Sequence, residues 1–268
     1  GTSSPLSRVT EYDPDYDPRG IQSFTSLGEA GPAPIHFFDD PGIFREPPMP
    51  AIFQSPDAYH RRGRIVDYGV PEQVMFGDFP GGLKDVATEN PDVREAMTQV
   101  YAEWVLRTDI DAFRIDTLKH VDYGFWEYFA PQLRMRLAAK GKTDFFLFGE
   151  AFSGDDVLLG TYTQPGRMDS VFYFSQKYTV FRDVFSAGMD TARIESLWSA
   201  RRTNWSATPQ VGGTGVAPVD APVNFMDNHD VSRFLFDFAD QDEGKRHLRA
   251  ALAFLFTEPG VPCVYYGT

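Results

Sequence analysis

Three short apolar segments of this sequence each close on a carboxylate side chain. The segments are 112–116, 145–150 and 223–230, and they end on Asp116, Glu150 and Asp230. Short apolar runs of this kind predict buried β-strands. Parallel α/β barrels present their functional side chains at the C-terminal ends of the strands. We therefore expect the three carboxylates to meet at one end of such a barrel.

Composition limits the classes of protein and partner. The chain has 268 residues, of which 42% are hydrophobic, so it is long enough to bury a substantial core. A net charge of −13 argues against a nucleic-acid backbone or an anionic membrane as partner. The sequence contains no stretch of about 18 apolar residues, so no membrane span is predicted. No signal peptide is seen. Cys263 is the single cysteine and is expected to be a buried thiol.

The first 88 residues differ in character from the rest. Ten of the chain's 20 prolines fall within the first 56 residues. Proline removes backbone donors and blocks helices, so residues 1–88 are predicted to form an irregular, loop-rich domain. Scattered apolar side chains such as Ile35 and Phe53 indicate that this segment packs against something. The second predicted domain covers residues 89–268.

Helical and strand patterns alternate from residue 90 onward. Strands are predicted at 110–116, 144–150, 168–174, 223–228 and 261–266. Helices are predicted at 91–107, through 125–137 with Pro131 near the start, at 178–202 and through 248–256. Strands that are apolar on both sides indicate a parallel sheet covered by helices. An open doubly wound sheet is the alternative, but no glycine-rich phosphate loop supports a nucleotide-binding version.

Two of the carboxylates stand in contrasting surroundings. Arg114 and Asp116 are two residues apart on one strand, so both side chains face the same way. A neighbouring guanidinium keeps an aspartate ionised, as a nucleophile requires. Glu150 ends an apolar strand, and such surroundings raise the pKa of a carboxyl until it can donate a proton near neutral pH. The alternatives are a structural Arg–Asp ion pair and a strand-end glutamate that meets solvent.

Further polar residues follow the first and third of these segments. His229 and Asp230 could bind sugar hydroxyls or a metal, although no histidine spacing supports a transition-metal site. Lys119 and His120 follow Asp116 on the same expected face, where solvation at the surface is the alternative for Lys119. An aspartate and a glutamate facing one ligand are the minimum set for cleaving a glycosidic bond.

The combination of these segments resembles the α-amylase family (glycoside hydrolase family 13). Residues 113–121, 148–152 and 225–230 are similar to the family's second, third and fourth signatures. Residues 82–91 are similar to the motif that ends the family's B domain, and residues 260–267 are similar to its last barrel strand. The order and spacing agree across residues 80–268.

The resemblance implies a role for each matching position. Asp116 corresponds to the nucleophile, Glu150 to the general acid/base and Asp230 to the transition-state stabiliser. Substrate contacts are implied for Arg114, Lys119, His120 and His229. The family's structural calcium implies Asp85 and the backbone carbonyl of His120 as ligands, and oxygen ligands suit that cation.

The family's first signature is absent before residue 80. The resemblance therefore implies a partial TIM (β/α)8 barrel containing strands four to eight, preceded by an irregular B-domain-like segment. The missing remainder of its own barrel is then an expected partner, together with an α-glucan. The leading hypothesis is retaining hydrolysis of α-1,4-glucosidic bonds. The alternatives are a transglycosidase of the same family and an inactive fragment or non-catalytic binding relative. An extracellular location is expected from the resemblance.

Overall fold

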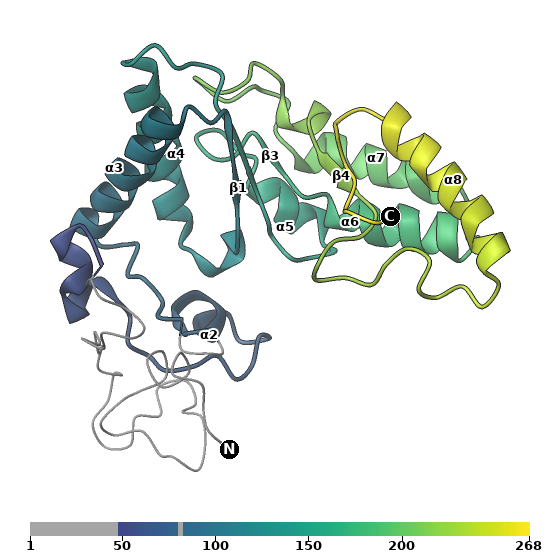
Figure 1. Cartoon of the computed structure of the whole chain (residues 1–268), viewed down its shortest axis with the longest axis horizontal. Helices are drawn as coiled ribbons and strands as arrows, with labels where there is room; N and C mark the ends of the chain where they lie inside the picture. The colour runs from purple at the N-terminus through teal and green to yellow at the C-terminus, as the bar shows by residue number, and fades with distance from the viewer. Residues whose placement is uncertain (1–47, 80–82) are drawn as a thin grey trace. The chain divides into compact units, whose positions relative to one another are not determined.

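The computed structural model describes residues 48–79 and 83–268. Contacts divide the chain into two compact units (Figure 1). The described part of the first unit comprises 48–79, 83–103 and 119–125, and the second unit comprises 104–118 and 126–268. The predictions for residues 1–47, including the packing of Ile35, and for Gly82 lie outside the described residues. The domain boundary at residues 88 and 89 stays a prediction.

The first unit is mostly irregular, as its proline content predicts. Its short helices are η2 (Ala51–Gln54), η3 (Pro56–Ala58) and α2 (Pro71–Phe76), followed by the start of α3 (Pro91–Thr108). The helix α2 was not predicted. Pro71 occupies its first turn, where a missing backbone N–H costs nothing. Phe53, Ala58 and Val93 form a small core, so the expected packing of Phe53 is confirmed.

The second unit is built on parallel strands. Among the described residues these are β1 (Ala112–Ile115), β2 (Phe146–Gly149), β3 (Ser170–Val171), β4 (Val223–Phe225) and β5 (Val261–Cys263). One sheet has the order β1-β2-β3 and the other pairs β4 with β5, all in parallel. A parallel bridge between Phe172 and Val223 links the two sheets. The predicted parallel arrangement of helix-connected strands is confirmed, with shorter strands than predicted.

The prediction that all strands are buried is wrong for β1 and β5. The residues of both strands are exposed or half-buried, whereas every residue of β3 and β4 is buried. In the described part of the chain, β1 pairs with β2 on one side only. An apolar run indicates a strand, but the neighbours of that strand decide how much of it is covered.

Two helix predictions also need correction. The predicted helix over 178–202 is two helices, the π-helix η5 (Lys177–Ser186) and α7 (Ala192–Asn204). Gly188 lies between them with φ of +68°, a left-handed conformation that interrupts a helix. Pro131 lies well inside α4 (Tyr123–Ala138) instead of near its start. The other helices of the unit are α5 (Asp156–Thr161), α6 (Phe174–Gln176) and α8 (Gln241–Thr257), with the 3-10 turn η6 (Pro218–Asp220).

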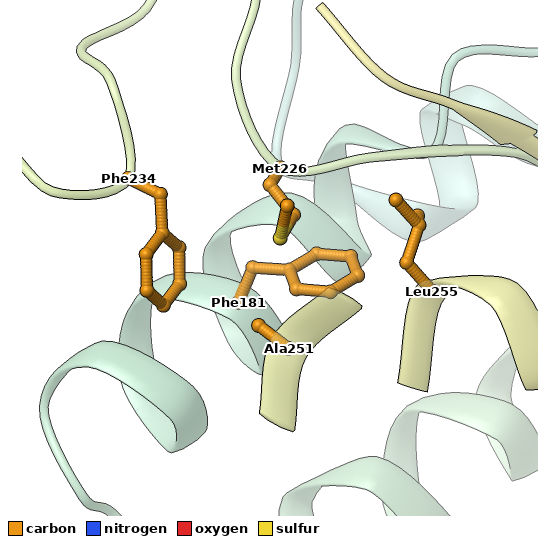
Figure 2. Close-up of a cluster of buried hydrophobic side chains, with 5 residues drawn as sticks. All are labelled: Phe181, Met226, Phe234, Ala251 and Leu255. Carbon is orange, nitrogen blue, oxygen red and sulfur yellow. The ribbon is translucent and has the colours of Figure 1, made fainter. Parts of the chain in front are cut away.

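One apolar cluster of the second unit lies beside the end of β4. Figure 2 shows its five side chains, which come from η5, from the segment after β4 and from α8. They are Phe181, Met226, Phe234, Ala251 and Leu255. The cluster fastens η5 and α8 to the segment that carries Asp230. No helix among the described residues is both long and apolar enough to span a membrane.

Candidate active site

Asp116 and Glu150 are brought together by the pairing of β1 with β2. Each carboxylate directly follows its strand, and the register pairs Ile115 with Gly149. The two next residues are therefore neighbours at the C-terminal end of the sheet. The backbone N–H of Glu150 donates to the carbonyl of Ile115 at 2.7 Å, which continues the ladder to the catalytic candidates.

Arg114 bridges the two carboxylates. Its Nη1 donates to Asp116 Oδ1 at 2.7 Å, and its Nη2 donates to Glu150 Oε2 at 3.0 Å. The contact with Asp116 agrees with the predicted shared face of a strand. The contact with Glu150 was not predicted, because the sequence alone does not reveal the register between two strands.

The environments of the two carboxylates differ. The Glu150 side chain is 7% exposed, whereas that of Asp116 is 61% exposed. Burial raises the pKa of Glu150 to about 7; the nearby carboxyl of Asp116 and the charge of Asp230 act in the same direction, against Arg114. Oε1 of Glu150 is buried and has no hydrogen-bond partner among the described residues. A carboxyl in this state can hold a proton near neutral pH and deliver it to a ligand.

Asp230 lies on a loop rather than at the end of a strand. The strand β4 stops at Phe225, so the prediction that Asp230 closes the strand is wrong. Asn228 Oδ1 accepts hydrogen bonds from the backbone N–H groups of Asp230 (2.8 Å) and Val231 (3.1 Å), which turns the chain away from the sheet. His229 Nε2 lies 3.0 Å from Asp230 Oδ2, and both side chains are about half-exposed.

A carboxylate without a predicted role holds this loop. Asp227 is buried, and its Oδ2 accepts a hydrogen bond from the backbone N–H of Phe234 at 2.9 Å. Its Oδ1 accepts from the Thr268 hydroxyl at 2.8 Å. Asp227 therefore positions the segment that carries Asp230. Its place in an apolar run was the available signal, because a buried carboxylate needs partners of this kind.

Lys119 and His120 belong to the first unit. The side chain of His120 is buried there, with Nδ1 2.9 Å from the Val74 carbonyl oxygen and its ring 4.6 Å from that of Phe79. Their expected contact with substrate stays a prediction.

The predicted calcium ligand Asp85 lies next to a histidine side chain. Asp85 Oδ2 lies 2.5 Å from His60 Nδ1, and His60 Nε2 lies 2.9 Å from Glu89 Oε2. No group of three or more candidate ligands is found within 48–79 and 83–268. The calcium ligands Asp85 and His120 stay predictions.

The sequence matches the family model described as "Alpha amylase, catalytic domain" over residues 72–268. It is 35% identical over 226 residues to an alpha-amylase of Streptomyces lividans, a match that covers 82% of this chain and 23% of that protein. It is 30% identical over 215 residues to a cyclomaltodextrin glucanotransferase of Niallia circulans, covering 78% of this chain and 26% of that protein. The chain thus spans about a quarter of the length of these relatives.

Solved structures give the same result for the fold. The alpha-amylase of Geobacillus thermoleovorans complexed with acarbose matches with a TM-score of 0.64 and 27% identity, over 79% of this chain and 44% of that one. An Anoxybacillus alpha-amylase matches with a TM-score of 0.65 and 29% identity, over 79% and 43% of the two chains. The predicted partial α/β barrel is confirmed. From the family model and these relatives, the chain belongs to the α-amylase family.

Proposed function

We propose that the protein containing this chain hydrolyses α-1,4-glucosidic bonds of starch-like glucans with retention of configuration. The bridge that Arg114 makes between Asp116 and Glu150 is the observation that carries the proposal. Retaining glycosidases need two carboxyl groups about 5–5.5 Å apart, one as nucleophile and one as acid. A single guanidinium bound to both groups holds them at short range.

The two surroundings assign the two roles. Glu150, with its raised pKa, is protonated at neutral pH and donates to the glycosidic oxygen. Asp116 is held beside the Arg114 guanidinium and attacks the anomeric carbon as the C–O bond breaks. In the second step Glu150 takes a proton from water, which attacks the glycosyl-enzyme and restores the α-configuration. Asp230 and His229 are assigned contacts with the sugar hydroxyls.

Three variants test the assignment. Asp116→Asn should lose nearly all turnover while still binding maltoheptaose, and Glu150→Gln should lose about 10²–10⁴-fold in kcat. Asp242→Asn alters a carboxylate that is 84% exposed on α8 and should leave turnover unchanged. The first product, followed by NMR, should be the α-anomer. Release of the β-anomer, or retained turnover in Asp116→Asn, overturns the proposal.

The pH profile provides a second test. Turnover should fall as pH rises above about 7, because ionisation of Glu150 removes the proton it must donate. A profile that stays flat to pH 9 would contradict the role of Glu150 as the acid.

The second candidate function is glycosyl transfer. One relative that is 30% identical to this chain is a cyclomaltodextrin glucanotransferase. The same carboxylates serve both reactions, which differ in whether water or a sugar attacks second. Products longer than the supplied maltooligosaccharide would establish transfer.

The missing remainder of the barrel is the proposed partner. In the described part of the chain, β1 pairs only with β2 and β5 only with β4, so each has one free edge. Exposed side chains such as Val261 and Val264 lie at the β5 end. An isolated chain without turnover that becomes active on co-expression with the preceding segment would support this proposal. Extracellular location and bound calcium are proposed from the resemblance alone.

A further inference from the structure

A cavity of about 350 Å³ opens beside Asp230 in the second unit. It is lined by residues of η5 and of the loop after β4, including the carboxylate-bearing Asp230 itself. Its apolar wall includes Phe181, Met226 and Phe234, three members of the cluster in Figure 2. The rest of the lining is largely polar and includes Ser186, Ser232 and Asp237. Aromatic side chains beside convergent polar groups can hold a small polar ligand.

Three basic side chains line this cavity, and two of them already have partners. Arg182 Nε donates to Asp183 Oδ1 at 2.7 Å. Arg233 Nη1 donates to the Thr268 hydroxyl at 3.1 Å, and its guanidinium lies 4.2 Å from the centre of the Tyr265 ring. These contacts fix both arginines as parts of the wall.

Lys177 is different. Its ammonium lies 4.7 Å from the centre of the Tyr178 ring, and no carboxylate among the described residues is within ion-pair distance of it. Burial and the charge of Arg182 lower the pKa of Lys177, against the charges of Asp227 and Asp237. A half-buried ammonium without a carboxylate partner has donors to offer a ligand in the cavity.

We propose that Lys177 is a specificity-determining residue that donates hydrogen bonds to the hydroxyls of a glucosyl unit lodged in this cavity. The Tyr178 ring lies between Lys177 and Arg182 in sequence, and the Arg182 guanidinium is 5.1 Å from its centre. The ring and the two cationic groups therefore form one polar and aromatic stretch of the cavity wall. Asp230 belongs both to the candidate active site and to the cavity wall, so the unit in the cavity is joined to the one being cleaved. The inference rests on the proposed function and names part of its substrate recognition.

The test measures kcat/KM on maltooligosaccharides of two to seven units. Lys177→Met keeps the stem of the side chain and removes the ammonium. It should lower kcat/KM about tenfold or more on substrates long enough to reach the cavity, with little change on the shortest one that is cleaved. Lys177→Arg should restore part of the loss. Lys245→Met, on the exposed surface of α8, is the matched control and should behave as the unchanged chain.

Binding of maltoheptaose by calorimetry separates the possible failures. An unchanged protein that binds and cleaves, with Lys177→Met equal to it at every length, overturns the role of Lys177 and leaves the proposed function standing. An equal loss at every length, with no rescue by Lys177→Arg, shows a structural role and also overturns the inference. The full-length protein that contains the unchanged chain is used throughout, and if it neither binds nor cleaves, both proposals are overturned.

Discussion

The strands in the middle of the sheet order and those at its two ends bury their side chains to different extents. In β3 and β4 every residue is buried, and in β2 every second residue is buried, whereas β1 and β5 are exposed or half-buried throughout. The middle strands have a neighbour on each side, counting the bridge between Phe172 and Val223. Each outer strand has one neighbour in the described part of the chain. The difference shows that burial in this fold is set by pairing more than by the apolar content of a strand.

The two carboxylates of the candidate active site differ in burial in the same way. Asp116 follows the outer strand β1 and is mostly exposed, whereas Glu150 follows β2, which is paired on both sides, and is buried. Burial is the largest cause of the raised pKa of Glu150. The different roles proposed for Asp116 and Glu150 therefore follow from the positions of the two strands.

The largest expected effect is on the free energy of unfolding. It is seen by comparing two aspartates that each precede a strand. Asp169, before β3, is fully buried and accepts from Arg134 Nη2 at 2.8 Å and from the Leu147 N–H at 2.9 Å. Asp169→Ala leaves the Arg134 charge buried without its partner and should lower the free energy of unfolding by about 3–5 kcal/mol. Urea unfolding followed by circular dichroism measures this change.

The matched control for Asp169 is at the start of the outer strand. Asp111, before β1, lies 3.0 Å from Lys142 Nζ, but its side chain is 94% exposed. Solvent screens such a pair, so Asp111→Ala should leave the urea midpoint nearly unchanged. Equal destabilisation by the two substitutions would break the comparison between inner and outer strands.

The second prediction compares two phenylalanines. Phe225 in β4 is fully buried, with its ring 4.8 Å from that of Phe174 and 5.2 Å from that of Phe172. Phe113 in β1 is half-buried, with its ring 5.1 Å from that of Phe145. Phe225→Ala should cost about 3–5 kcal/mol, and Phe113→Ala clearly less, because part of its ring is already in water. The two unfolding midpoints, measured in the same buffer, decide the point.

The sequence predicted what depends on local pattern. The apolar runs located all the strands observed in the described residues, and the two-residue spacing predicted that Arg114 and Asp116 would share a face. It did not predict what depends on neighbours, such as the exposure of β1 or the contact from Arg114 to Glu150. Neither property can be read from a strand taken by itself.

Two local features also escaped prediction for physical reasons. The Asn228 side chain turns the chain before Asp230, and an amide in an apolar run does not reveal which N–H groups it will accept from. Gly149 lies within an apolar strand, where glycine is usually unfavourable. A Cβ at that position would lie 2.3 Å from Leu118 Cδ1. The glycine therefore allows the close packing behind Glu150.

The smallest expected effect concerns Glu258, which follows α8 and precedes the outer strand β5. Gln176 Nε2 donates to Glu258 Oε2, and the buried side chains of Arg201 and Tyr173 face the same carboxyl, with Asp156 acting on Tyr173 from α5. Burial raises the pKa of Glu258 to about 8, although Gln176 and Arg201 act to lower it. The burial that is typical of the inner strands thus extends to Glu258, although the next strand, β5, is an outer strand.

The sign of the pH effect follows from this shift. The unfolded carboxyl ionises near its ordinary pKa of 4.5, whereas the folded one keeps its proton up to about pH 8. The folded state therefore holds an extra proton between these values, and the free energy of unfolding falls as pH rises through that window. Glu258→Gln should remove the part of the decrease between pH 5 and pH 8 that this carboxyl contributes. Glu243→Gln, on the exposed first turn of α8, should keep it.

Glu150 adds a decrease of the same sign that ends near pH 7. Although burial lowers it, the pKa of His60 is also raised by its contacts with Asp85 and Glu89, so His60 contributes to the decrease as well. The difference between the unchanged chain and Glu258→Gln between pH 7 and pH 8 therefore reports Glu258. If unfolding curves of Glu258→Gln and of the unchanged chain run parallel in that interval, the carboxyl is already ionised in the folded state. The buried surroundings of the middle strands would then end at α8. The difference in burial between middle and outer strands would be larger than the burial of Glu258 indicates.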